Sequence, residues 1–225
     1  MSAGDPGAAG TSTAVRVVIA VGAALALLLL GGALGLLLAT PGQDSRPGPS
    51  AVDIGFAQDM TTHHQQAVTM ATLARERGAD VAVRQLAFDI ETNQRDQIGR
   101  MRGWLGLWGE PGSPSGPPMG WMRESGHQHG AAPGTGASAT MPGMASTAEL
   151  DRLRGLEGPA FDSYFLQLML RHHEGGAPMA RYGSEHAELA PVRGLAANML
   201  GSQASESRLM RGMLGDRGVA PLPLG

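Results

Sequence analysis

The sequence of 225 residues contains no cysteine. This absence excludes disulfides, thiolate nucleophiles and the zinc or iron–sulfur sites that cysteine holds. Any metal bound by this chain must therefore be held by histidine, methionine, carboxylate or amide groups.

Aromatic residues are scarce, at 4%, and the formal net charge is −3, so no basic surface indicates nucleic-acid binding. The sequence shows no nucleophile elbow, phosphate loop or nucleotide fingerprint. The sequence offers few candidates for a general acid or base, because the acidic residues nearest the expected core have no equivalents in the internal repeat described below. These are Asp59, Glu91, Glu174 and Glu206. We assign no catalytic residue, and whether the protein is an enzyme stays open.

A long apolar run lies near the N-terminus. Val17 to Leu38 contains no charged side chain over 22 residues. As a helix it would span roughly 33 Å, which matches a bilayer core and exceeds the apolar region of a typical signal peptide. The run predicts an uncleaved, single-pass membrane anchor. Arg16 and Arg46 flank it evenly, so charge does not determine its orientation.

Two Pro- and Gly-rich stretches divide the rest of the chain, one after the anchor and one in the middle. We predict an N-terminal tail, a transmembrane anchor, a stalk, one helical domain and a C-terminal tail: 1–16, 17–39, 40–52, 53–217 and 218–225. Within the domain we predict a first repeat, a flexible loop containing Met and His, and a second repeat: 53–109, 110–146 and 147–217.

The repeat is the most informative feature of the sequence. The segment Phe56 to His64 recurs 109 positions later as Phe165 to His173, with Phe, Gln, Met and the His pair in the same places. The offset holds without a gap to Leu214. A chance match would not keep register over some fifty residues, so the sequence predicts a duplicated helical hairpin.

Apolar residues follow a heptad spacing in each segment, as bundle helices require. The first helix of each hairpin places one His on this stripe, and the second places one Gln there. Asp80 is expected to cap the second helix and Gly109 to end it, while Gly183 and the stretch 188–191 are expected to separate the third helix from the fourth. A short extra helix is expected over 147–156. The predicted fold is all-α: a ferritin-like four-helix bundle preceded by one transmembrane helix.

A Met-x-x-His-His element stands at the same place in both repeats. Helical spacing puts the Met and the first His on one face, and packing the two helices together would gather the imidazoles and thioethers near one level. Imidazole binds many metals and thioether sulfur favours Cu(I), so copper is the expected ion. The Met three residues before each first His replaces the Glu that di-iron bundles require. The predicted ligands are Met60, His63, His64, Met169, His172 and His173.

The same residues admit a structural interpretation. A buried neutral His can be satisfied by a Gln across the core, and Met is a common core filler. In that case His63 would bond Gln94 and His172 would bond Gln203, with no metal involved. Further residues are accessory candidates for a metal site: Gln94, Gln203, Glu206, Met70, Met179, His127 and His129. The loop also holds Met119, Met122, Met141 and Met144, which either recruit soft metals or pack the loop onto the bundle.

The doubled pattern F-x-x-x-M-x-x-H-H-x-x-[AG]-x-x-M-A, at 56–71 and 165–180, resembles the family called domain of unknown function 305 (DUF305). The likeness covers about 53–214. It implies a ferritin-like bundle in an exported or membrane-anchored protein, with its soluble domain outside the cytoplasm. Some relatives are linked to copper binding and tolerance, and no enzymatic activity is implied.

This chain departs from the family pattern in two places. A Glu expected three residues after the helix Gln is present as Glu206 but replaced by Gln97 in the first repeat. Pro178 follows the second His pair and removes a backbone donor from that helix. The two halves of a site are therefore not expected to be equivalent.

Three hypotheses of function follow. The first is a copper-binding protein for sequestration, buffering or delivery outside the cytoplasm. The second is a metal-dependent redox enzyme that uses the same residues. The third is a scaffold bundle with structural histidines.

Overall fold

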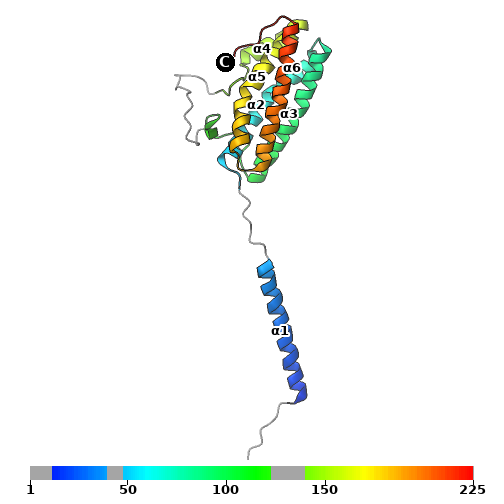
Figure 1. Ribbon diagram of the computed structural model, residues 1–225, viewed down its shortest axis with the longest axis vertical. Helices are drawn as coiled ribbons and strands as arrows, with labels where there is room; N and C mark the ends of the chain where they lie inside the picture. The colour runs from blue at the N-terminus through cyan, green and yellow to red at the C-terminus, as the bar shows by residue number, and fades with distance from the viewer. Residues whose placement is uncertain (1–11, 40–47, 123–139, 225) are drawn as a thin grey trace, which may run out of the picture. The chain divides into compact units, whose positions relative to one another are not determined.

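The computed structural model describes residues 12–39, 48–122 and 140–224, which form two compact units, 1–46 and 47–225. The described residues form helices and no strands, which confirms the all-α prediction. Helices make up the regular structure described in both units (Figure 1).

The N-terminal unit contains α1, Thr13–Ala39. Its part from Thr13 to Leu36 is long and apolar enough to cross a membrane, judged by length and composition. A signal sequence at this position would pass the same test. The chain therefore carries an N-terminal apolar helix that fits either an anchor or a signal peptide.

The second unit contains four long helices that lie side by side (Figure 1). They are α2 (Ala51–Arg77), α3 (Val81–Trp108), α5 (Gly158–His186) and α6 (Ala190–Asp216). Helix α2 packs on α3 and on α5, and α5 packs on α6. Two short elements lie in the central connection, a 3₁₀ turn (Gly120–Met122) and α4 (Thr147–Gly155). The helix predicted over 147–156 thus ends one residue earlier.

Most helix ends of the structure lie at the capping residues that the sequence predicted. The side chain of Asp80 accepts a hydrogen bond from the Ala82 N–H and caps α3, and Gly109 ends α3 with a φ of 73°. The expected break at Gly183 is wrong, because α5 continues through Pro178 and Gly183 to His186. Gly183 serves packing instead: a Cβ there would lie 2.7 Å from the Phe56 ring.

Each hairpin also closes the turn of the other. The buried carboxylate of Asp162 on α5 accepts hydrogen bonds from the Ala79 and Asp80 N–H groups, at 3.0 and 2.8 Å. At the equivalent positions, Asp53 on α2 accepts from the Glu188 and Leu189 N–H groups, at 3.1 and 3.0 Å. These four bonds tie the two hairpins together at opposite ends of the helices.

The core consists of two apolar clusters, one toward each end of the helices. The first includes Phe161, Phe165 and Ile90, and the second includes Phe56 and Met101. Between them every long helix places polar residues at buried positions. These are His63, His64, Gln94, Gln97, His172, His173 and Gln203, together with the partly buried Glu206.

The carboxylate of Asp162 provides a test of the contact between the hairpins. Asp162→Ala removes an acceptor shared by two N–H groups, and hydrogen bonds to charged groups typically contribute about 1.5–3 kcal/mol each. We expect a loss of about 2–3 kcal/mol in the free energy of unfolding, measured by urea denaturation of the full chain in detergent with circular dichroism. Asp151→Ala, at an exposed ion pair on α4, is the control, with an expected change within about 0.5 kcal/mol. Equal losses in the two variants would contradict the role of Asp162.

Candidate metal site: a buried histidine layer

The polar residues between the two apolar clusters form one layer, called here the histidine layer. It consists of His63 and His64 on α2, Gln94 and Gln97 on α3, His172 and His173 on α5, and Gln203 and Glu206 on α6. Because α2 and α5 run antiparallel and carry the His pairs near their midpoints, the pairs meet at the same height. All four imidazoles are at most 1% exposed.

The central contact of the layer joins the two repeats. The rings of His63 and His172 stack with centroids 3.8 Å apart and an interplanar angle of 28°. The ring of His64 lies 6.5 Å from that of His63. The sequence predicted that the imidazoles would converge, and the structure places these rings together inside the core.

Each imidazole uses its Nε2 atom to reach an oxygen. His63 contacts the Pro142 carbonyl at 3.2 Å, and His172 contacts the His63 carbonyl at 3.0 Å. His64 contacts Gln97 Oε1 at 2.6 Å, and His173 contacts Glu206 Oε2 at 2.5 Å. All four partners are acceptors, so the hydrogen-bond network assigns the proton to Nε2 in each ring. In a neutral ring this leaves the lone pair on Nδ1.

The Nδ1 atoms of all four histidines are buried and have no hydrogen-bond partner within the protein. The same is true of Gln94 Oε1, Gln94 Nε2 and Gln203 Oε1. Six of these atoms carry free lone pairs and one is a donor. Buried polar groups without partners are costly, and their presence commonly marks a place for an ion or ordered water. An excess of lone pairs favours a cation or water over another acceptor.

The amide partners that the structural interpretation requires are not formed. His63 contacts Pro142 in place of Gln94, and the side chain of Gln94 has no partner at either polar atom. His172 contacts the His63 carbonyl in place of Gln203. The two Gln side chains thus add unpartnered oxygens to the layer and do not satisfy the imidazoles.

Burial keeps three of the rings neutral. Desolvation lowers the pKa of His63 to about 4 and that of His64 to about 3, against an ordinary value of 6.5. Desolvation also lowers the pKa of His172 well below the ordinary value, and the neighbouring His63 adds to this effect. At neutral pH these rings therefore offer lone pairs without first losing a proton.

The predicted thioethers flank the layer and do not lie at one level within it. Met60 belongs to the second apolar cluster and Met169 to the first, because α2 and α5 run in opposite directions. Met70 and Met179 are likewise divided between the two clusters. His127 and His129 lie outside the described residues.

The described ends of the central loop pack onto the helices. Met119, Met122 and Met144 lie against the second apolar cluster, and Met141 is part of it. Trp121 is buried and donates its Nε1–H to Asp59 Oδ2 at 2.8 Å. In this part of the loop the packing interpretation of its methionines holds.

A strap of residues 141–145 covers the layer, and its role was not evident from the sequence. Pro142 supplies the carbonyl that orients His63, and the Gln66 amide holds both the N–H and the carbonyl of Ala145, at 2.6 and 2.8 Å. Gly175 allows the approach, since a Cβ there would lie 2.4 Å from the Pro142 backbone. The sequence places Gly175 two residues after His173, but no pattern in the sequence predicts its contact with Pro142.

No three His, Asp or Glu side chains within the described part of the chain converge in the manner of a complete metal cage. The layer thus provides oriented imidazoles with free lone pairs, but three His or carboxylate ligands do not converge on one point.

The profile of the family named Domain of unknown function (DUF305) matches residues 53–214. The chain belongs to the DUF305 family. No curated protein matches it, whereas several solved structures are similar to it. A DUF305 protein from Streptomyces coelicolor, described as secreted, is 42% identical, with a TM-score of 0.68 and coverage of 76% of this chain and 97% of its own. A DUF305 fragment from Deinococcus radiodurans is 34% identical, with a TM-score of 0.61 and coverage of 76% and 99%.

The third structure is CopM in its Cu(II)-bound form, 26% identical, with a TM-score of 0.54 and coverage of 73% of this chain and 96% of that one. CopM also has a Cu(I)-bound form, for which the 23% identity shows likeness of fold alone. The apolar N-terminal helix and the likeness to a DUF305 protein described as secreted indicate a secreted or membrane-anchored protein.

The lowered pKa values of the histidines predict a steep loss of stability in mild acid. Unfolding exposes His63, His64 and His172 to water, where they bind protons near pH 6.5. Their stabilising effect is complete above that pH and is lost as the pH falls toward their folded values, about 4 for His63 and about 3 for His64. Each group contributes a slope of up to about 1.4 kcal/mol per pH unit. We expect a marked fall in the free energy of unfolding of the metal-free full chain between pH 6.5 and 4.5, measured by urea denaturation with a chelator present.

The pKa of Glu149 is lowered to about 2, chiefly by Arg171. Its titration therefore affects stability below pH 4.5, outside the range of pH 6.5 to 4.5 over which the histidines are tested. His64→Gln should reduce the slope between pH 6.5 and 4.5, and His186→Gln, at an exposed position, should not. A flat profile over this range would contradict the neutral, buried state of the rings.

Proposed function

We propose that this DUF305 protein binds copper in the histidine layer, outside the cytoplasm, and serves in copper sequestration, buffering or delivery. The observation that carries the proposal is the set of four buried imidazoles whose Nδ1 atoms have no partner in the protein. No turnover is required for such a role.

The donor pattern fits a metal site. Histidines that ligate metals almost always donate their other ring N–H to a carboxylate or a carbonyl, which fixes the tautomer and the ring orientation. All four rings of the layer do so, through the Pro142 and His63 carbonyls, Gln97 and Glu206. Each lone pair is thereby left on Nδ1, inside the core.

The chemistry of the available atoms favours copper. Imidazole suits copper and zinc, and thioether sulfur selects Cu(I). The ligands for copper would come from His63, His64, His172 and His173, with Met60 and Met169 within one helical turn of them and Gln94 and Gln203 as neighbouring oxygens. Cu(I) accepts low coordination numbers, so a cage of three His or carboxylate ligands is not a requirement. Copper bound here would be held in a desolvated site shielded from water by both apolar clusters.

The relatives support the same assignment. CopM has been solved with Cu(I) and with Cu(II), and the Streptomyces coelicolor protein is described as secreted. The recurrence of the His pairs, the Asp clasps and their turns at an offset of 109 supports duplication of an ancestral hairpin and a ferritin-like four-helix bundle. The apolar run of α1 supports single-pass anchoring of this domain.

The scaffold hypothesis is less well supported. Structural histidines would be expected to satisfy the polar groups around them, yet both polar atoms of Gln94 and all four Nδ1 atoms lack protein partners. A metal-dependent redox enzyme remains an alternative, which measurable oxidase turnover by the copper-loaded protein would favour.

The proposal predicts that the purified full chain in detergent binds Cu(I) and is stabilised by it. Binding is measured anaerobically by competition with a chromophoric chelator. A free Cu(I) concentration of 100 times the Kd should raise the free energy of unfolding by about 2.7 kcal/mol. The paired variant His63→Gln and His172→Gln should weaken binding at least about tenfold.

His186→Gln serves as the control, since this ring is exposed and contacts Tyr182 away from the layer. Circular dichroism verifies that the paired variant is folded before titration. Absence of copper binding, or the same affinity in the paired variant and the control, would exclude the proposal.

A second prediction concerns space in the layer. A Cβ at Gly176 would lie 2.9 Å from His63 Cε1, 3.4 Å from His63 Nδ1 and 3.6 Å from Gln203 Oε1. Gly176→Ala should therefore displace the His63 ring and weaken copper binding although no ligand is removed. Gly201→Ala on α6 meets no atom within 4 Å and should bind copper as the unmodified protein does. Equal affinities of the two variants would show that His63 Nδ1 takes no part in binding.

A further inference from the structure

The two outer histidines of the layer occupy equivalent positions but have chemically different partners. His64 Nε2 lies 2.6 Å from Gln97 Oε1 in the first hairpin, and His173 Nε2 lies 2.5 Å from Glu206 Oε2 in the second. His173 and Glu206 each follow their counterparts by 109 positions. The geometry is thus nearly the same on both sides, and the difference is one negative charge.

The first-hairpin amide is held as an acceptor. Gln97 donates its Nε2–H to Asn93 Oδ1 at 3.1 Å, which directs its Oε1 toward His64. The two imidazoles therefore have the same tautomer, with Nδ1 free, and differ only in what stands behind Nε2. A neutral amide is a weaker acceptor than a carboxylate.

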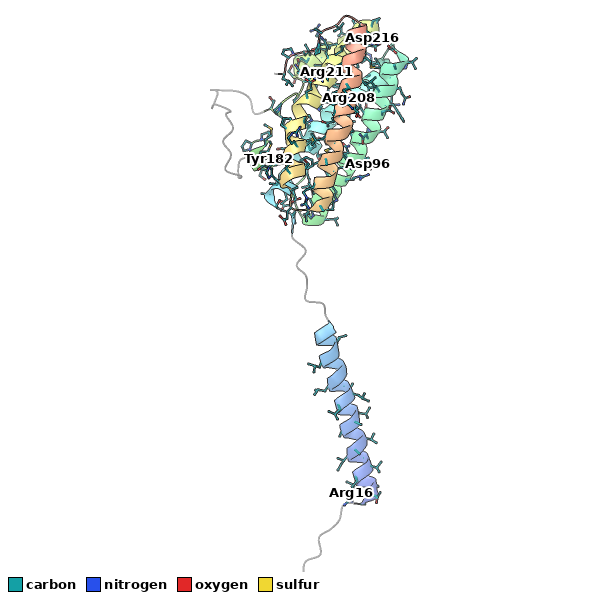
Figure 2. The ribbon with its side chains drawn as sticks, in the orientation of Figure 1. Arg16, Asp96, Tyr182, Arg208, Arg211 and Asp216 are labelled. Carbon is teal, nitrogen blue, oxygen red and sulfur yellow. The ribbon has the colours of Figure 1, made fainter. Side chains whose placement is uncertain are left out.

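Glu206 is not shared with an arginine in any described ion pair. Arg208 and Arg211 project from the same helix, α6 (Figure 2). Arg211 pairs with Glu174, and Arg208 donates to Ser205 Oγ. The described partner of Glu206 is the His173 ring, whose side chain is fully buried, while that of Glu206 is 17% exposed. A carboxylate at the edge of a dry core interacts strongly with a cation inside it, because little water screens the charge.

From this asymmetry we propose that Glu206 is the charge-compensating residue of the copper site and makes the His173 side of the layer fill before the His64 side. A carboxylate behind Nε2 raises the electron density on the ring and adds an attractive charge for the bound ion. Changes to such residues behind a ligand typically alter metal affinity by 10–100-fold. This inference rests on the proposed function, and it assigns Glu206 a positioning role without direct contact with the metal.

The test uses reciprocal variants of the full chain in detergent, with Cu(I) as the probe. Glu206→Gln gives the second hairpin the chemistry of the first and should weaken binding of the first equivalent by about 10–100-fold. Gln97→Glu in the same chain should restore that affinity, now on the other side. Competition with a chromophoric chelator measures both constants.

A spectroscopic measurement identifies the side that fills first. Imidazole ¹⁵N NMR of the histidine-labelled chain resolves Nδ1 from Nε2, and Cu(I) is diamagnetic. Substoichiometric Cu(I) should shift His173 Nδ1 before His64 Nδ1 in the unmodified protein, and the order should reverse in the double variant. A structural role of Glu206 in folding alone would change stability without reversing this order.

Glu174→Gln is the matched control. It removes the same charge from the residue next to His173, but its carboxylate pairs with Arg211 and is not bonded to an imidazole of the layer. An equal loss of affinity in this control, or an unchanged order of filling in the double variant, would overturn the role of Glu206. Failure of all these proteins to bind Cu(I) would instead exclude the proposed function together with this inference.

Discussion

The structure depends on one unusual constraint, which is a polar layer placed in the middle of a helical core. Apolar clusters above and below the layer remove water from four imidazoles and three Gln side chains. Burial favours neutral rings, and the acceptors around them fix which nitrogen carries the proton. The resulting set of inward lone pairs has a chemical use only if an ion or water satisfies it. Packing and function are therefore linked through the same atoms.

The layer is built by two hairpins that make the same contacts twice. The Asp53 and Asp162 carboxylates each close the turn of the other hairpin, and Arg84 and Arg193 each bind two carbonyls of their own turns, at 2.6–2.9 Å. These contacts fix the relative height of α2 and α5, and hence the stacking of His63 on His172. Two antiparallel copies of one helix can bring equivalent residues together only near their midpoints, which is where the His pairs stand.

The symmetry is broken where the chain leaves the repeat. The strap at 141–145 has no counterpart in the first repeat, and it covers one side of the layer through Pro142 and the Gln66 clamp. The symmetry is also broken in charge, because the first repeat has the neutral Gln97 where the second repeat has Glu206. The two sides of the layer therefore differ in charge, with a carboxylate behind His173 and a neutral amide behind His64.

The sequence by itself determined the helices, the repeat and the residues of the layer. Heptad spacing identified the buried stripe, from Phe56 to Ala74 and from Phe165 to Met179, because side-chain direction in a helix follows from position alone. The caps at Asp80 and Gly109 were likewise local and therefore predictable. Only the tertiary structure decided the partners. The contacts of His63 with Pro142 and of His172 with a backbone carbonyl join residues 79 and 109 positions apart, and no local pattern encodes them. The continuation of α5 through Gly183 and the separation of Met60 from Met169 were also decided there, since close helix packing and antiparallel direction act only once the helices meet.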